Sequence, residues 1–139
     1  ARVGPGQGGR HAAMCARGRG RPAARDVLAS ASAVLGRDVF AAAADEARFD
    51  NALAQPLLCA ATLAHWHGVR EALPAPLLVA GYSIGELAAH AVAGSVDAST
   101  CLDLAGDRKK HTCSGEAGHH HLFHNASCVA KIIVIVKRL

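Results

Sequence analysis

The sequence predicts an α/β fold, in which helices flank a parallel β-sheet. The strongest observation is a succession of three patterns: an apolar run at 76–80, a Gly-x-Ser-x-Gly turn at 81–85 and a helical pattern over 84–93. Elsewhere, alanine-rich helical segments alternate with short strand-like segments. The 139 residues, 51% of them hydrophobic, are enough for one domain with its own core.

The first half of the chain is predicted to begin with a short strand at 1–3 and a glycine-rich turn at 4–9. A loop is expected at 17–22, where arginine, glycine and proline dominate. Helices are predicted over 24–35 and 38–47, because alanine is the best helix former and is frequent in both segments.

The second half is predicted to start with a longer helix over 56–72, because proline is favoured at the first position of a helix. A strand at 77–80 follows, and then helices at 84–93 and 98–108. The β-branched residues of 128–136 predict a last strand.

Ser83 lies at the centre of the Gly-x-Ser-x-Gly turn, between the predicted strand and the helix that follows. In this context the serine is presented above the sheet in a strained conformation, as a candidate nucleophile. Gly81 and Gly85 leave room where Cβ atoms would collide. The first N–H groups of the helix and its positive end are directed at the serine, which favours a negatively charged oxygen there.

A change in composition predicts a boundary after residue 108. Residues 1–108 hold ten arginines and ten acidic residues, whereas residues 109–139 hold four lysines, one arginine and one glutamate, and therefore the whole net charge of +4. We interpret 109–139 as an unrelated or frameshifted tail, with a natural variable C-terminus as the alternative. Because the first part is neutral overall, the charge is no reason to expect a nucleic-acid partner.

Several short motifs carry a resemblance to a known family. They are Pro5-Gly6-Gln7-Gly8, Ala54-Gln55-Pro56, Gly81-Tyr82-Ser83-Ile84-Gly85-Glu86, Ala93-Gly94 with Asp97, and Arg108 placed 25 residues after Ser83. In this order and spacing, residues 2–108 resemble the malonyl-CoA:acyl carrier protein transacylase family. The Gly-Tyr-Ser form of the turn looks closest to the malonyltransferase (epsilon) subunit of malonate decarboxylase.

The resemblance implies an incomplete α/β-hydrolase-like parallel sheet with flanking helices, lacking the ferredoxin-like small subdomain of the family. Residues 1–108 would be the N-terminal part of an acyltransferase catalytic domain. The implied reaction moves a malonyl group from malonyl-CoA to the phosphopantetheine-type thiol of an acyl carrier protein, through a serine-linked acyl-enzyme. Malonyl-CoA is then a substrate, and no bound cofactor is expected.

The resemblance also implies a role for each matching residue. Ser83 would be the nucleophile, and the backbone N–H groups of Ile84 and Gln7 would stabilise the oxyanion. Arg108 would bind the free carboxylate of the malonyl group with two parallel hydrogen bonds, which a lysine cannot make. Tyr82 stands where the family usually has histidine.

The histidine that serves the family as general base has no match in residues 109–139. His90 lies seven residues after Ser83, about 10 Å along a helix. That is too far for a proton transfer, which needs ~3 Å between the two heavy atoms. We therefore expect a weakly active or inactive copy of the enzyme.

Two other functions are open. A serine esterase or hydrolase uses the same Gly-x-Ser-x-Gly turn, although it needs neither the turn around Gln7 nor Arg108. A non-catalytic fragment would only fold or bind.

The remaining patterns exclude other classes of protein. Five scattered cysteines with no secretory segment indicate reduced thiols and a cytoplasmic protein. The apolar run at 132–136 is too short to cross a membrane. The histidines within 119–124, together with Cys113 and Cys128, fit no standard zinc spacing, so no metal site is predicted.

Overall fold

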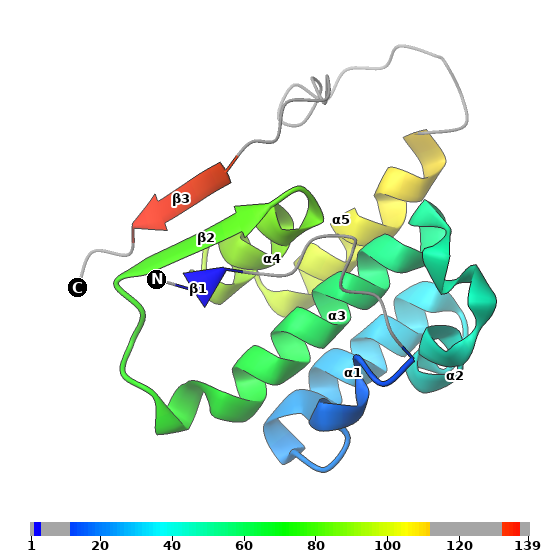
Figure 1. Cartoon of the computed structure of the whole chain (residues 1–139), viewed down its shortest axis with the longest axis horizontal. Helices are drawn as coiled ribbons and strands as arrows, with labels where there is room; N and C mark the ends of the chain where they lie inside the picture. Colours follow the sequence, from blue (N-terminus) through cyan, green and yellow to red (C-terminus); the bar gives the residue numbers. More distant parts are fainter. Residues whose placement is uncertain (1, 4–11, 112–131, 137–139) are drawn as a thin grey trace.

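The computed structural model describes residues 2–3, 12–111 and 132–136 (Figure 1). In chain order the elements are β1 (Arg2–Val3), η2 (Ala16–Gly18), α1 (Pro22–Leu35), α2 (Val39–Ala44), η3 (Glu46–Phe49), α3 (Asn51–Val69), η4 (Arg70–Ala72), β2 (Leu78–Tyr82), α4 (Ile84–Val92), α5 (Ala98–His111) and β3 (Ile132–Val136), where η marks a 3-10 helix. The predicted alternation of strands and helices around Ser83 is confirmed. The boundary predicted after residue 108 falls inside α5 and stays a prediction.

The sheet has the strand order β1-β2-β3 and is mixed. β1 pairs with β2 in parallel, with Val3 opposite Ala80. β3 pairs with β2 in the antiparallel sense, with Tyr82 opposite Ile132. The prediction of a parallel sheet is therefore wrong for the last strand. A β3 parallel to β2 would need a connection that returns the chain to the edge of the sheet at which β2 begins. Because α5 runs in the same general direction as β2, the chain is not returned to that edge, and β3 pairs with β2 in the antiparallel sense (Figure 1).

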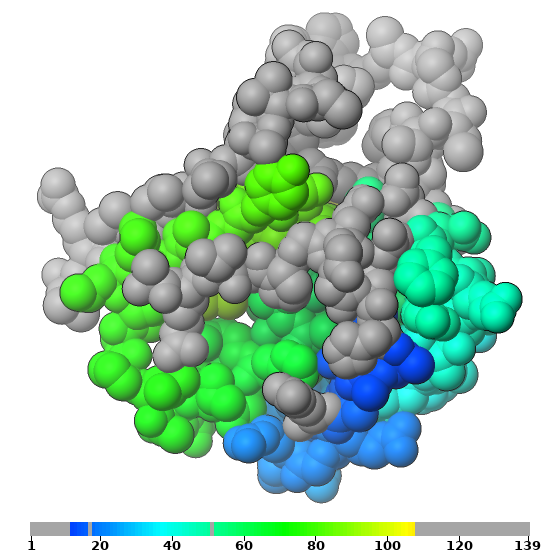
Figure 2. Space-filling model, viewed as in Figure 1, coloured from blue at the N-terminus to red at the C-terminus, as the bar shows by residue number. Residues whose placement is uncertain are grey.

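The helices form a layer beside the sheet, and α3 lies at its centre against α1, α4 and α5. In the space-filling view, the described residues of α1, α2 and α3 form one continuous surface (Figure 2). The largest fully buried side chains of this layer include Leu57, Leu63 and Leu102. Removing such side chains from water is the main source of stability in a layer of this kind.

α4 joins the helical layer to the sheet, because two of its faces are buried. Ile84 and Leu87 belong to the large core cluster of the helices. Ala89 and Ala93 pack against Val79 of β2 in a second, smaller cluster. The helix that begins next to Ser83 is thus held from both sides.

α3 starts at Asn51, five residues before the proline that predicted its start. The N–H groups of Leu53 and Ala54 donate to the backbone oxygen of Asp50, 3.0 and 2.8 Å away. Pro56 is fully buried inside the helix. At this sixth position its missing N–H removes one intrahelical hydrogen bond. The neighbouring Ala54 and Leu57 are buried with it, which offsets this loss.

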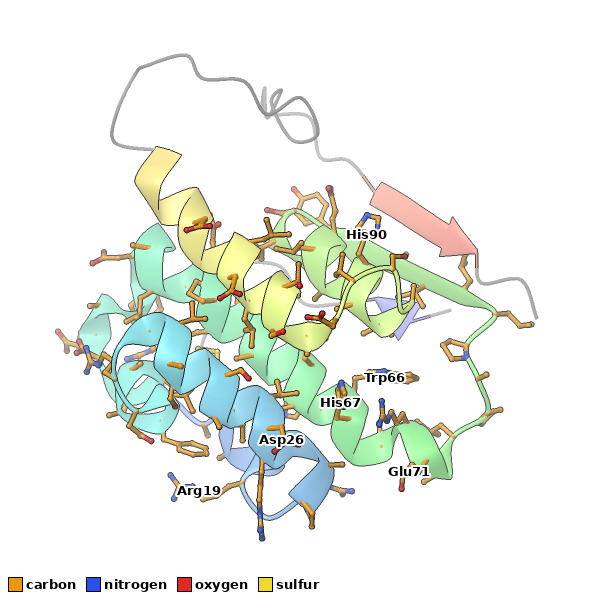
Figure 3. All side chains as sticks on the ribbon, turned by 180° about the vertical axis from the view of Figure 1, so that it is seen from behind. Arg19, Asp26, Trp66, His67, Glu71 and His90 are labelled. Atoms are coloured by element: carbon orange, nitrogen blue, oxygen red, sulfur yellow. The ribbon has the colours of Figure 1, made fainter. Side chains whose placement is uncertain are left out.

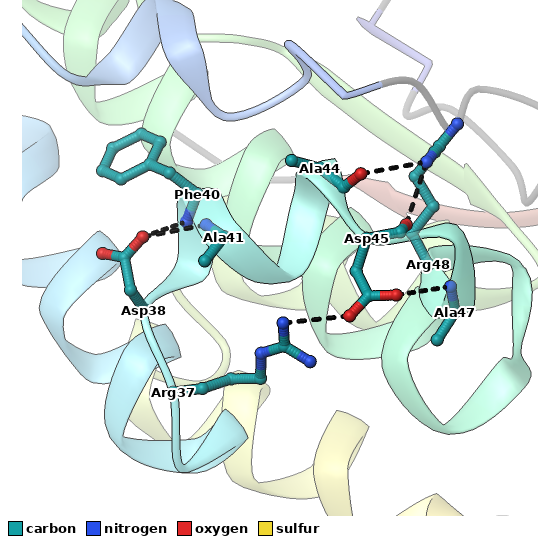
Figure 4. Close-up of polar contacts among 8 residues, drawn as sticks. All are labelled: Arg37, Asp38, Phe40, Ala41, Ala44, Asp45, Ala47 and Arg48. Atoms are coloured by element: carbon teal, nitrogen blue, oxygen red, sulfur yellow. Dashed lines mark hydrogen bonds and ion pairs between the residues drawn. The ribbon is translucent and has the colours of Figure 1, made fainter.

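The helix predicted over 38–47 is divided at Asp45 into α2 and η3 (Figure 4). Asp38 begins α2, and its carboxylate accepts from the N–H groups of Phe40 and Ala41 at 3.0 and 2.8 Å. Asp45 accepts from the N–H of Ala47 at 2.9 Å and begins η3 in the same way. Aspartate at such a position competes with the helical backbone for hydrogen bonds, which the alanine content alone did not reveal.

The arginine- and glycine-rich segment predicted as a loop contains η2 and is tied to the end of α3. The guanidinium of Arg21 donates to the backbone oxygen of Gly68 at 2.6 Å. A cation at the carboxyl end of a helix is stabilised by the unpaired carbonyl groups there.

Candidate active site

Ser83 occupies the corner between β2 and α4 and has a strained backbone. Its φ and ψ angles are 56° and −124°. Among the described residues it is the one non-glycine residue with a positive φ. For a residue with a Cβ atom, such a backbone conformation costs of order 1–3 kcal/mol of stability. It persists only where the surrounding structure imposes it.

The surroundings that impose this conformation are the backbones of the two glycine positions of the turn. A Cβ atom added to Gly81 would meet the carbonyl oxygen and carbon of Gly85. These are main-chain atoms, which cannot rotate out of the way as a side chain can. Strand and helix are therefore in direct backbone contact below the serine.

The Ser83 side chain is exposed and makes no capping hydrogen bond to α4. In the sequence Ser-x-x-Glu, a capping box would direct the serine oxygen to the N–H of the glutamate. Here the N–H of Glu86 donates instead to the backbone oxygen of Ser83, at 3.1 Å. The hydroxyl is thus not used for capping, while the first N–H groups of α4, including that of Ile84, have no acceptor within the helix.

The other predicted site residues are only partly placed. Gln7 lies outside the described residues, although β1 ends at the same edge of the sheet as β2, because the two strands run in parallel. The backbone of Arg108 belongs to α5. Cys101 and Ala105, earlier in the same helix, are buried.

The histidines are spread over several elements. His90 is half-buried near the end of α4, two turns away from Ser83, and its backbone oxygen accepts from the N–H of Ser95 at 2.9 Å (Figure 3). His11 and the histidines within 119–124 lie outside the described residues. No general base is assigned among the described histidines.

His67, near the end of α3, has a pKa below its ordinary value, because burial disfavours the charged ring and the nearby Arg70 adds to this effect. Asp26 acts in the opposite sense (Figure 3). Since the unfolded chain binds the proton more tightly, folding stability falls as the pH drops below 6.5. Urea unfolding of the His67→Gln variant should show a weaker loss of stability between pH 7 and pH 5.5 than the original chain. Equal losses in both would contradict the shift.

The described cysteines, Cys15, Cys59 and Cys101, are buried in the core. Cys59 and Cys101 pack as small core residues of α3 and α5. Burial raises the pKa of Cys15 to about 11, so its thiol is a poor nucleophile at neutral pH. Within the described part of the chain, no helix is long and apolar enough to span a membrane, and no three metal-binding side chains gather in one place.

A strained serine between a strand and a helix start is typical of the α/β proteins that present a serine nucleophile for acyl transfer or hydrolysis. No family model matches the chain. A curated relative named malonyl CoA-acyl carrier protein transacylase, from Mycobacterium tuberculosis H37Rv, is 38% identical over 110 residues, covering 75% of this chain and 36% of the relative. The protein of the same name from Mycolicibacterium smegmatis is 40% identical over 92 residues, covering 63% and 32%.

Solved structures agree with these relatives. An acyl carrier protein S-malonyltransferase from Vibrio cholerae matches with a TM-score of 0.70 and 33% identity, over 78% of this chain and 37% of that one. A malonyl-transacylase in complex with a type II polyketide acyl carrier protein matches with a TM-score of 0.69 and 35% identity, with the same coverage. The chain belongs, over the part that matches, to the malonyl CoA-acyl carrier protein transacylase family. It spans about a third of the length of these relatives.

Proposed function

We propose that Ser83 accepts a malonyl group from malonyl-CoA and passes it to the thiol of an acyl carrier protein. The observation that carries the proposal is the strained, exposed serine at the start of α4, in a chain that belongs to a family of malonyltransferases. The structural neighbour that holds an acyl carrier protein supports this kind of partner. The resemblance of the Gly-Tyr-Ser turn to malonate decarboxylase stays a prediction, and it does not single out one carrier among those of fatty acid synthesis, polyketide synthesis and malonate breakdown.

In the first half-reaction, the Ser83 oxygen attacks the thioester carbonyl, its proton passes to solvent water, and a tetrahedral oxyanion forms. The C–S bond then breaks, the CoA sulfur takes a proton from solvent and departs as the thiol, and the malonyl group remains on the serine as an ester. The N–H groups of Ile84 and Gln7 would stabilise the oxyanion, and loss of one such donor typically costs about 10²–10³ in rate. In the second half-reaction the carrier thiol attacks the ester, and the serine regains its proton.

A direct test is to incubate the chain with malonyl-CoA and, separately, with p-nitrophenyl acetate, and to measure the intact mass. We expect a malonyl adduct on Ser83, formed slowly because residues 109–139 carry no match to the family's base. An acetyl adduct alone would favour the esterase. The absence of both adducts would favour the non-catalytic fragment and overturn the proposal.

The Arg108→Ala variant tests how the malonyl group would be recognised. Hydrogen bonds to a charged group contribute about 1.5–3 kcal/mol, so the variant should acylate from malonyl-CoA about 10–100-fold more slowly. Acylation from acetyl-CoA should be unchanged, because acetyl has no free carboxylate. The Arg108→Lys variant keeps the charge but loses the two-pronged geometry. Malonyl loading that is equally fast in Arg108→Ala and the original chain would rule out the carboxylate role.

A further inference from the structure

Gly106 is an unusual residue for its position, because it lies in the interior of α5. Glycine is a much poorer helix former than alanine, by about 1 kcal/mol. The neighbouring helix leaves no room for an alanine here. A Cβ atom added at this position would lie 2.8 Å from Cγ1 of Val34 on α1, closer than real Cβ contacts.

Val34 has little freedom to move aside. It is β-branched, and such side chains have one strongly preferred rotamer in a helix. Its helix is itself anchored, because Val27, Leu28 and Ala31 of α1 are buried in the main core. A larger residue in place of Gly106 would therefore push α5 away from α1.

The same turn of α5 carries Arg108, two residues further on. The start of α5 is held independently, because the carboxylate of Asp97 accepts from the N–H of Thr100 at 2.7 Å. α5 also packs against α4, the helix that begins next to Ser83. The close approach at Gly106 is thus the contact with α1 that comes just before the last part of α5.

We propose that Gly106 is a positioning residue, which lets α5 lie close against α1 and so places Arg108 for the malonyl carboxylate. The inference rests on the proposed function of Ser83 and Arg108. It goes beyond that function because it assigns the selectivity for malonyl over acetyl groups to a helix contact between Gly106 and Val34.

The test compares the rates of Ser83 acylation from malonyl-CoA and acetyl-CoA, measured by intact mass, in the original chain and in Gly106→Ala. A displacement of about 1 Å can cost up to 10²-fold in rate, so we expect the malonyl-to-acetyl ratio to fall about tenfold. General destabilisation would lower both rates together and leave the ratio unchanged. Gly20→Ala is the matched control, because a Cβ atom there meets nothing within 4 Å.

The double variant Val34→Ala with Gly106→Ala removes the clashing methyl groups and should restore the ratio. It also carries the test if Gly106→Ala alone does not fold. In an Arg108→Ala background, Gly106→Ala should have no further effect on the ratio, since it is argued to act through that arginine. A ratio in Gly106→Ala equal to that of the original chain, or a double variant that is not restored, would overturn the inference. If the original chain takes up no malonyl group at all, the proposed function itself fails.

Discussion

Replacing Gly81 with alanine is expected to cost about 3 kcal/mol of folding stability, at the upper end of what overpacking costs. The new Cβ atom would meet the main chain of Gly85, so rotation of a side chain cannot relieve the clash. Strand β2 or helix α4 must shift instead, and α4 is buried on both of its faces. Since domains are typically stable by only about 5–15 kcal/mol, the loss is large. Urea unfolding followed by circular dichroism measures it.

Gly20→Ala is again the control, because it makes the same chemical change in open space. It should shift the unfolding midpoint little, in the range usual for surface substitutions, about 0.5 kcal/mol or less. If Gly81→Ala were as stable as Gly20→Ala, the backbone contact between β2 and α4 would not be as close as the structure has it.

Two substitutions of Ser83 are expected to separate strain from chemistry. Both Ser83→Ala and Ser83→Gly remove the hydroxyl, so neither should form a malonyl adduct under conditions in which the original chain does. Only glycine also relieves the positive φ of 56°. We therefore expect Ser83→Gly to be more stable than Ser83→Ala by about 1 kcal/mol, after the greater entropy of glycine in the unfolded chain offsets part of the gain.

Thermal and urea unfolding of the two variants, with intact mass after malonyl-CoA treatment, give both readouts. Equal stability of the two variants would mean that the serine corner stores no conformational strain. An adduct on either variant would place the reactive group elsewhere in the chain. The original serine would then be an ordinary turn residue, in spite of its exposed hydroxyl.

The helices were well predicted from alanine content and periodicity, and their differences from the prediction have local causes. Asp45 ends α2 early, because its carboxylate accepts a backbone N–H and begins a 3-10 turn. α3 extends backwards past Pro56, because the preceding turn is hydrogen-bonded to Asp50. At Asp45 a hydrogen bond outweighed a helix propensity of a few tenths of a kcal/mol per residue. At Pro56 the hydrogen bonds of the preceding turn and the burial of the helix outweighed the cost of proline inside a helix, about 3 kcal/mol.

The serine corner was determined by the sequence itself, because its geometry depends on residues that are neighbours along the chain. Gly81, Ser83 and Gly85 lie within five positions, and the absence of a Cβ atom at Gly81 lets the strand lie against the main chain of Gly85. The direction of β3 and the contact between Gly106 and Val34 were decided only by the tertiary structure. Both depend on how segments far apart in the sequence come to lie beside one another, and no local pattern of residue types determines which distant segments meet.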